Sequence, residues 1–89
     1  MPTIYLIIHG KVQGVFFRAS ARKAADALNI KGWVKNRQDG NVEIMANGTE
    51  EKLQKFLQWC GQGPPGAEVS AVEQFAVEDI VFDKFSIEM

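Results

Sequence analysis

The chain has very few of the side chains that build disulfides, metal centres and Cys-His catalytic sites. Its 89 residues include one cysteine, Cys60, and one histidine, His9. A single cysteine cannot form an internal disulfide. One histidine and one cysteine this far apart in sequence also argue against a zinc site or a catalytic Cys-His pair. We therefore expect no metal and no cofactor.

A strong charge of either sign and long apolar runs are missing as well. The formal net charge is −1, so the overall balance gives no reason to expect binding to nucleic acid or to a membrane surface. No hydrophobic stretch is long enough to span a bilayer. Residues 1–3 lead straight into an apolar segment without the preceding basic stretch of a signal peptide. A chain of this length can bury one small core, so we expect a single domain over residues 1–89. Without a signal peptide or a membrane span, we expect the protein in the cytoplasm. We also expect it to be a monomer.

A glycine-bearing stretch, residues 9–18, joins an apolar run to an amphipathic pattern. Residues 4–8 are apolar at successive positions and rich in β-branched side chains, which is typical of a strand buried on both faces. After the stretch, apolar residues recur at helical spacing and predict a helix over about residues 17–28. The apolar face of this helix comprises Phe17, Ala21, Ala24, Ala25 and Leu28.

The junction between this strand and this helix has the composition of an anion-binding loop. The first N–H groups of a helix lack internal partners and carry partial positive charge. Gly10 and Gly14 would let the preceding backbone turn its N–H groups inward. Arg18 in the first helical turn is easier to explain if an anion lies between its guanidinium and the loop amides. From the spacing alone, an ordinary turn with a solvated arginine is an equally good interpretation.

The next segments predict a hairpin and a second helix. Asp39-Gly40 lies between the strand-like residues 31–37 and 42–46, which is a strong signal for an antiparallel hairpin. Thr49 or a neighbour can then cap a helix with acidic residues in its first turn. The Gly/Pro-rich residues 61–66 cannot continue that helix. Its buried stripe comprises Leu53, Phe56, Leu57 and Cys60.

Two more strands complete the predicted order. Residues 68–77 alternate imperfectly, which indicates a β-bulge or an edge position. Phe85, Ile87 and Met89 alternate with polar residues and predict a short strand that runs to the terminus. The order β-α-β-β-α-β with an added C-terminal strand predicts an α+β, ferredoxin-like split βαβ sandwich. We expect an antiparallel-rich sheet with both helices on one face.

Two segments of the chain resemble the two signatures of the acylphosphatase family. Residues 8–18, Ile-His-Gly-Lys-Val-Gln-Gly-Val-Phe-Phe-Arg, resemble the first, and residues 32–42, closed by Gly48, resemble the second. Two motifs in the family's order and spacing are far more specific than either alone. The resemblance covers essentially the whole chain. It implies a hydrolase that converts acyl phosphates to a carboxylate and inorganic phosphate. If the anion loop binds the phosphoryl group, we expect inorganic phosphate to bind there too and to inhibit competitively.

The resemblance also implies roles for particular residues. The arginine of the family that matches Arg18 binds the phosphoryl group, and the asparagine that matches Asn36 positions the attacking water. In the split βαβ order, the strand bearing Asn36 can lie beside the strand that leads into the loop. Gln13 and Gly14 are expected to set the shape of the loop. The phosphate-binding segment then comprises Lys11, Val12, Gln13, Gly14, Val15, Phe16, Phe17 and Arg18.

This chemistry is consistent with the residues present. A carboxylate leaves without being protonated, so no general acid is needed, and neither motif places a histidine or carboxylic acid where one would act. Fixed amides and one guanidinium can stabilise a loose phosphoryl transition state without a metal. Asn36 can orient a water but cannot deprotonate it. We therefore expect the proton to pass to a phosphate oxygen of the substrate.

Other interpretations remain open from the sequence. A non-catalytic anion- or ligand-binding regulatory module with the same ferredoxin-like fold would keep the anion loop. An RNA-binding domain of this fold would need a Lys/Arg-Gly-Phe-Gly-Phe pattern, which is absent. Among the remaining residues, His9 is expected at the surface, Cys60 in the core and Asp39 in the hairpin turn, while Lys11 and Lys35 are most simply solvated.

Overall fold

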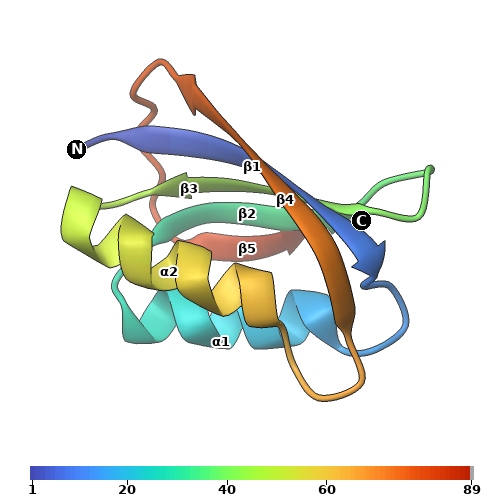
Figure 1. Cartoon of the computed structure of the whole chain (residues 1–89). Coiled ribbons are helices and arrows are strands. Elements are labelled where there is room, and N and C mark those ends of the chain that lie inside the picture. Colours follow the sequence, from blue (N-terminus) through green and yellow to red (C-terminus); the bar gives the residue numbers. More distant parts are fainter. Residues whose placement is uncertain (89) are drawn as a thin grey trace.

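A mixed β-sheet with two helices on one face makes up the computed structural model, which describes residues 1–88 (Figure 1). The elements in chain order are β1 (Thr3–Lys11), α1 (Phe17–Ala27), β2 (Lys31–Asn36), β3 (Val42–Asn47), α2 (Glu50–Gln62), β4 (Glu68–Val77) and β5 (Phe85–Glu88). None of the helices within residues 1–88 is long and apolar enough to cross a membrane.

The strand order explains how distant segments of the chain meet. Across the sheet the order is β4-β1-β3-β2-β5. β1 pairs antiparallel with both β3 and β4, and β2 and β3 form the predicted antiparallel hairpin. β5 adds parallel to β2 at the far edge. The predicted ferredoxin-like arrangement with an additional C-terminal strand is therefore confirmed. Met89, which was also expected in that strand, lies outside the described residues.

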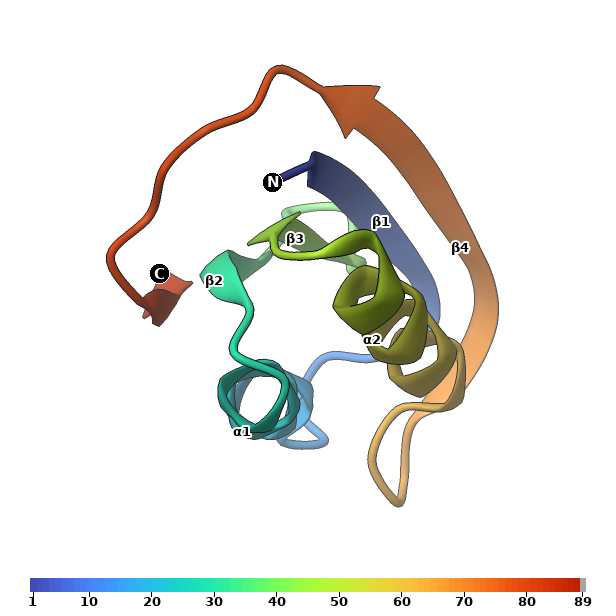
Figure 2. The same ribbon diagram turned by 90° about the vertical axis from the view of Figure 1, so that its left-hand side faces the viewer.

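The hydrophobic core lies between the sheet and the helices, which sit inside the curve of the sheet (Figure 2). On β1, Ile4, Leu6 and Ile8 are buried on the helix side, whereas Tyr5 and Ile7 are only half-buried on the other face. The expectation that this strand is buried on both faces was therefore wrong. Its apolar run is continuous, but both helices cover the same face of the sheet.

Both helices pack their predicted stripes on the core. In α2, Leu53, Phe56 and Cys60 are buried, whereas Ala24, Leu28 and Leu57 of the two stripes are only partly buried. In α1, Phe17, Ala21 and Ala25 are buried, and the ring of Phe17 lies 5.3 Å from that of Trp59 on α2. The side-chain oxygen of Thr49 accepts a hydrogen bond of 3.3 Å from the Lys52 amide, which confirms the predicted cap of α2.

The end of α2 differs from the prediction. The helix continues through Gly61 to Gln62, although residues 61–66 were expected to form a loop. A glycine inside a helix is unfavourable but does not remove a hydrogen bond, whereas a proline does. The helix therefore ends at Gln62, and Gly63, its C-cap, directly precedes the two prolines.

β4 has both of the features that its irregular pattern indicated. It lies at an edge of the sheet, and its pairing with β1 shifts between His9 and Gly10. His9 pairs with Ala71 and Gly10 pairs with Val69, so Ser70 is the additional residue of a β-bulge. Gly10 has φ 126°, and a Cβ there would lie 2.1 Å from the carbonyl oxygen of Glu68. The close approach of the two backbones therefore requires glycine.

Candidate active site

The N-terminus of α1 faces the loop that follows β1, as the sequence predicted. Phe16, the residue before the helix, has φ 63° and ψ 25°, and within residues 1–88 no side chain caps the helix start. The first amides of α1 therefore keep their hydrogen-bonding capacity. Together with the positive end of the helix dipole, they favour an anion at this position.

A pocket of about 310 Å³ opens at the start of α1. It brings together Arg18 of the helix and Asn36, the last residue of β2. Arg18 and Asn36 therefore meet, as expected. The expectation that the strand bearing Asn36 lies beside the strand leading into the loop was wrong, because β3 lies between β1 and β2. The lining is completed by Val12, Gly14, Phe16, Phe17, Ala19 and Ile87. Among the predicted phosphate-binding residues, Lys11, Gln13 and Val15 do not line this pocket.

The C-terminal strand contributes to the same site. Ile87 lines the pocket, and Nη1 of Arg18 donates a hydrogen bond of 3.3 Å to the carbonyl oxygen of Glu88. This bond orients one arm of the guanidinium while the side chain stays partly exposed. Sequence reasoning missed the contribution of β5, because nothing in the two motifs refers to the end of the chain.

Asn36 presents an acceptor without a protein partner. Its Oδ1 is buried and makes no hydrogen bond within the described part of the chain. A buried carbonyl oxygen in this state is costly, and such groups are rare in folded proteins. The Asn36 amide can therefore accept a hydrogen bond from a small molecule in the pocket.

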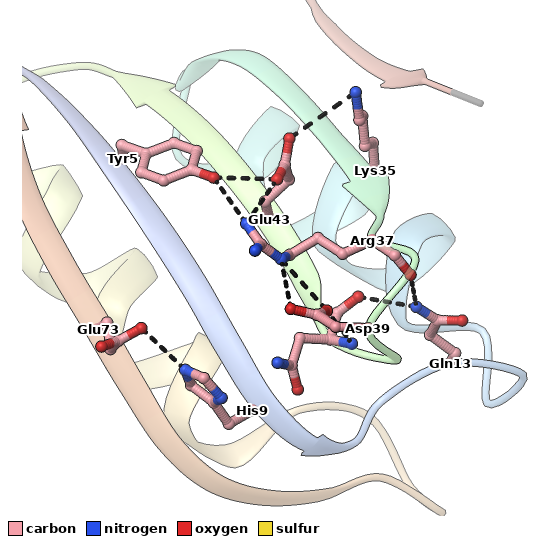
Figure 3. Close-up of polar contacts among 9 residues, drawn as sticks. Tyr5, His9, Gln13, Lys35, Arg37, Asp39, Glu43 and Glu73 are labelled. Atoms are coloured by element: carbon pink, nitrogen blue, oxygen red, sulfur yellow. Dashed lines mark hydrogen bonds and ion pairs between the residues drawn. The ribbon is translucent and has the colours of Figure 1, made fainter.

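Gln13 joins the loop to the hairpin (Figure 3). Its Nε2 donates hydrogen bonds of 2.8 Å to the carbonyl oxygens of both Arg37 and Asn41. These two residues flank the hairpin turn, where the Arg37 amide donates to the Asn41 carbonyl at 2.8 Å. Because Arg37 directly follows Asn36, the Gln13 side chain connects the two segments that carry the candidate residues.

An ionic network holds the same hairpin on the open face of the sheet (Figure 3). Nη1 of Arg37 lies 3.0 Å from Oε2 of Glu43 and 3.1 Å from the Tyr5 hydroxyl. That hydroxyl donates to Glu43 at 2.9 Å, and Nζ of Lys35 lies 3.8 Å from the same carboxylate. Burial, together with the hydrogen bond to Glu43, raises the pKa of Tyr5.

The network was not predicted, although one signal was available. In the predicted hairpin Lys35 and Glu43 are paired directly across the two strands, where opposite charges attract. Asp39 lies in the turn, as expected, and its Oδ1 accepts a hydrogen bond of 3.1 Å from the Asn41 amide. That bond, helped by Arg37, lowers the pKa of Asp39.

His9 and Cys60 lie outside the pocket. Nε2 of His9 is 2.9 Å from Oε2 of Glu73, across the β1–β4 pair. Cys60 is fully buried, as predicted, and burial raises the pKa of its thiol far above the usual range. A thiol that stays protonated is a poor nucleophile. Within residues 1–88, no group of three or more His, Cys, Asp or Glu side chains is arranged to hold a metal ion.

The sequence is similar to those of known acylphosphatases. The Acylphosphatase family model matches residues 4–87. The acylphosphatase of Cupriavidus necator is 53% identical over 68 residues, which cover 76% of this chain and 74% of that protein. The acylphosphatase of Cupriavidus metallidurans is 45% identical over 83 residues, which cover 93% of this chain and 87% of that protein.

The fold leads to the same family. The crystal structure of acylphosphatase from Bacillus subtilis is similar with a TM-score of 0.97 and 38% sequence identity, and the match covers 100% of both chains. Similarity of sequence and structure thus extends over the strand, loop and helix that form the pocket. The chain belongs to the acylphosphatase family.

Proposed function

We propose that the chain hydrolyses acyl phosphates by in-line attack of a water that Asn36 positions on a phosphoryl group held by Arg18 and the loop amides. As a member of its family, the chain is an acylphosphatase, a hydrolase of acyl phosphates. The proposal concerns which residues carry out the reaction. The observation that supports it most is that Arg18 and Asn36 line one pocket at the uncapped start of α1.

In this proposal the phosphoryl group is held by two kinds of donor. Amides of the segment from Lys11 to Phe17 direct N–H groups toward the phosphoryl oxygens, as helix starts commonly do. The forked guanidinium of Arg18 adds charge-assisted hydrogen bonds. The bond from Arg18 to the Glu88 carbonyl reduces the freedom of its side chain before substrate binds. These donors stabilise charge that spreads over the phosphoryl oxygens in a loose transition state.

The water is positioned by the free carbonyl oxygen of Asn36. Oδ1 accepts one hydrogen bond from the water and leaves a lone pair of the water directed at phosphorus. As the new O–P bond forms, the bond from phosphorus to the acyl oxygen breaks, and its electron pair leaves on the carboxylate. One proton of the water passes to a phosphoryl oxygen, because an amide is not a useful base. If the chain were a non-catalytic module that only binds an anion, Asn36 would have no function in the pocket next to Arg18.

The proposed function also includes inhibition by the product, a monomeric state and a cellular location. We expect inorganic phosphate to bind the same donors as the phosphoryl group and to inhibit competitively. We also expect the protein to act as a monomer in the cytoplasm, a reducing compartment in which a lone thiol such as Cys60 stays free.

Hydrolysis in ¹⁸O-labelled water tests where the attack occurs. Attack at phosphorus places the label in inorganic phosphate, which ³¹P NMR resolves as a shifted signal, and leaves the carboxylate unlabelled. Attack at the acyl carbon places the label in the carboxylate instead. Label in the carboxylate under enzymatic turnover would contradict the proposed role of the pocket.

A further inference from the structure

The two residues that flank Asn36 in the sequence both contact one carboxylate. Nζ of Lys35 lies 3.8 Å from Oε1 of Glu43, and Nη1 of Arg37 lies 3.0 Å from Oε2 of the same side chain (Figure 3). The Tyr5 hydroxyl donates a further hydrogen bond of 2.9 Å to that Oε2. Glu43 therefore binds the chain immediately before and immediately after a residue of the candidate site.

These contacts lie on the face of the sheet opposite to the pocket. Successive side chains of an extended chain point to opposite faces, so Lys35 and Arg37 share the open face while Asn36 points toward the helices. The pairing of β2 with β3 agrees, because Lys35 lies directly opposite Glu43. Asn36 lies opposite Val42, which is buried in the core. Glu43 thus acts on the backbone around Asn36 without lining the pocket.

The position of the Asn36 side chain depends on the backbone that carries it. Its buried Oδ1 has no hydrogen-bond partner among residues 1–88 that could orient it. Positioning of a reactant tolerates little error, since a displacement of about 1 Å can lower the rate by up to about 10²-fold. Contacts that fix the backbone on both sides of Asn36 therefore bear on how well it orients the water.

The Glu43 carboxylate is shielded from water although it lies on the open face of the sheet. Its side chain is only 14% exposed, and a carboxylate in such a place is unfavourable unless it is paired and hydrogen-bonded. A cross-strand pair of β-branched residues would stabilise the two strands without burying a charge. Precise placement of the hairpin accounts for the network better than stability alone.

We propose that Glu43 is a positioning residue, which binds Lys35 and Arg37 and thereby fixes the place of Asn36 relative to the phosphoryl group. This inference rests on the proposed function, because Glu43 acts only through Asn36. Glu43 contacts neither the phosphoryl group nor the water. Its removal should therefore lower kcat and leave the affinity for inorganic phosphate nearly unchanged.

A double-mutant cycle with Asn36 tests the proposal. Glu43→Ala should lower kcat by roughly 10- to 100-fold, the scale for groups that orient a functional residue without touching the substrate. In an Asn36→Ala background the same substitution should change kcat by less than about twofold, because the residue through which it acts is gone. Glu43→Gln should lose less than Glu43→Ala, since its amide oxygen still accepts hydrogen bonds from Arg37 and Tyr5.

Calorimetric titration with inorganic phosphate separates positioning from a loss of folded protein. The stoichiometry gives the fraction of each sample that binds phosphate, and kcat is then expressed per binding site. Glu73→Ala is the matched control. The Glu73 side chain lies in the same cross-strand row as Glu43 and pairs with His9 at 2.9 Å, away from Asn36. Its removal should leave kcat unchanged.

Three results would overturn the proposed role of Glu43. These are a kcat in Glu43→Ala equal to that of the parent, an equal loss of kcat in Glu73→Ala, and the same fold-loss from Glu43→Ala with and without Asn36. If Asn36→Ala itself keeps the kcat of the parent, the proposed function fails and the role of Glu43 fails with it. That outcome is distinct from the other three, in which Asn36→Ala is impaired.

Discussion

Nε2 of Gln13 donates a hydrogen bond of 2.8 Å to the carbonyl oxygen of Arg37, the residue that follows Asn36. With its second bond to Asn41, this side chain joins the anion loop to the hairpin. Gln13 therefore adds a direct link between the loop and the residue after Asn36, beside the pairing of β1, β3 and β2 in the sheet. Gln13 is a positioning residue in this account, since it acts on the water through the hairpin.

Replacement of Gln13 should therefore impair turnover more than phosphate binding. In Gln13→Ala the hairpin is free to shift relative to the loop, and a displacement of about 1 Å can lower kcat by up to about 10²-fold. The inhibition constant of inorganic phosphate should change much less. Gln58→Ala, at an exposed position on α2, is the matched control and should behave as the parent. Equal kcat in both variants would show that Gln13 does not position the site.

The bulge between β1 and β4 predicts an unequal effect of alanine at two glycines with positive φ. In Gly40→Ala the new Cβ meets open space, so only backbone strain applies and the free energy of unfolding should fall by about 1–2 kcal/mol. In Gly10→Ala the Cβ also overlaps the Glu68 carbonyl, so the loss should be clearly larger. Denaturant unfolding of the two variants measures the difference, and similar losses would contradict the close approach.

Cys60 should matter to stability and not to catalysis. Cys60→Ala should keep full turnover. Its free energy of unfolding should fall by about 1 kcal/mol, the lower end of the cost of deleting a buried group. Because burial raises the pKa of this thiol in the folded state, its contribution to stability is complete below the unfolded pKa, about 8.5. Above that pH the unfolded state ionises, so the stability difference between the parent and Cys60→Ala should shrink. Rapid reaction of the native thiol with Ellman's reagent would show that it is accessible.

Inorganic phosphate should stabilise the folded protein, because it binds the native pocket and not the unfolded chain. At a free concentration of 100 times its dissociation constant, the gain is about 2.7 kcal/mol, which thermal melts detect as a higher Tm. Sodium chloride at matched ionic strength is the control. The rise in Tm should persist in EDTA, which removes divalent metal ions, because the amides and Arg18 supply the positive charge that binds phosphate. A Tm that responds only to ionic strength would contradict the assignment of the anion loop.

Periodicity predicted most of the elements correctly, because the pattern of each is local. The helical stripe of α1, the Asp39-Gly40 hairpin and the Thr49 cap each depend on residues close together in sequence. The burial of β1 was predicted incorrectly for the opposite reason. Tyr5 and Ile7 look like core residues, yet their cover comes from neighbouring strands such as β4, where Phe75 packs on Tyr5 with ring centroids 6.0 Å apart.

For the candidate site, the meeting of Arg18 and Asn36 was predicted correctly. The strand bearing Asn36 was expected beside β1, however, and β3 lies between the two strands. The contact of Arg18 with Glu88 could not be predicted, because it depends on β5 adding to the edge of the sheet beside β2. The exposure of Phe16 could not be predicted from the sequence either. The sequence contains two adjacent phenylalanines, and only the left-handed backbone at the first directs one outward while the other enters the core.

Replacing Arg18 and replacing Asn36 should impair different properties of the enzyme. Arg18 contacts the phosphoryl group in the ground state and in the transition state, so Arg18→Ala should weaken phosphate binding as well as turnover. Arg18→Lys should restore only part of both, because a point charge cannot reproduce the forked geometry of a guanidinium. Calorimetric titration with phosphate and steady-state kinetics on folded samples measure the two effects. Unchanged phosphate affinity in Arg18→Ala would exclude Arg18 as the phosphoryl ligand.

The most direct test of the account is the phosphate affinity and kcat of Asn36→Ala, measured on the same folded sample. Asn36 acts on the water alone, so phosphate affinity should stay close to that of the parent. Turnover should fall by roughly 10²–10³-fold, the scale of losing one positioned polar group in a preorganised site. An Asn36→Ala protein with the kcat of the parent would contradict the assignment of the attacking water to this residue.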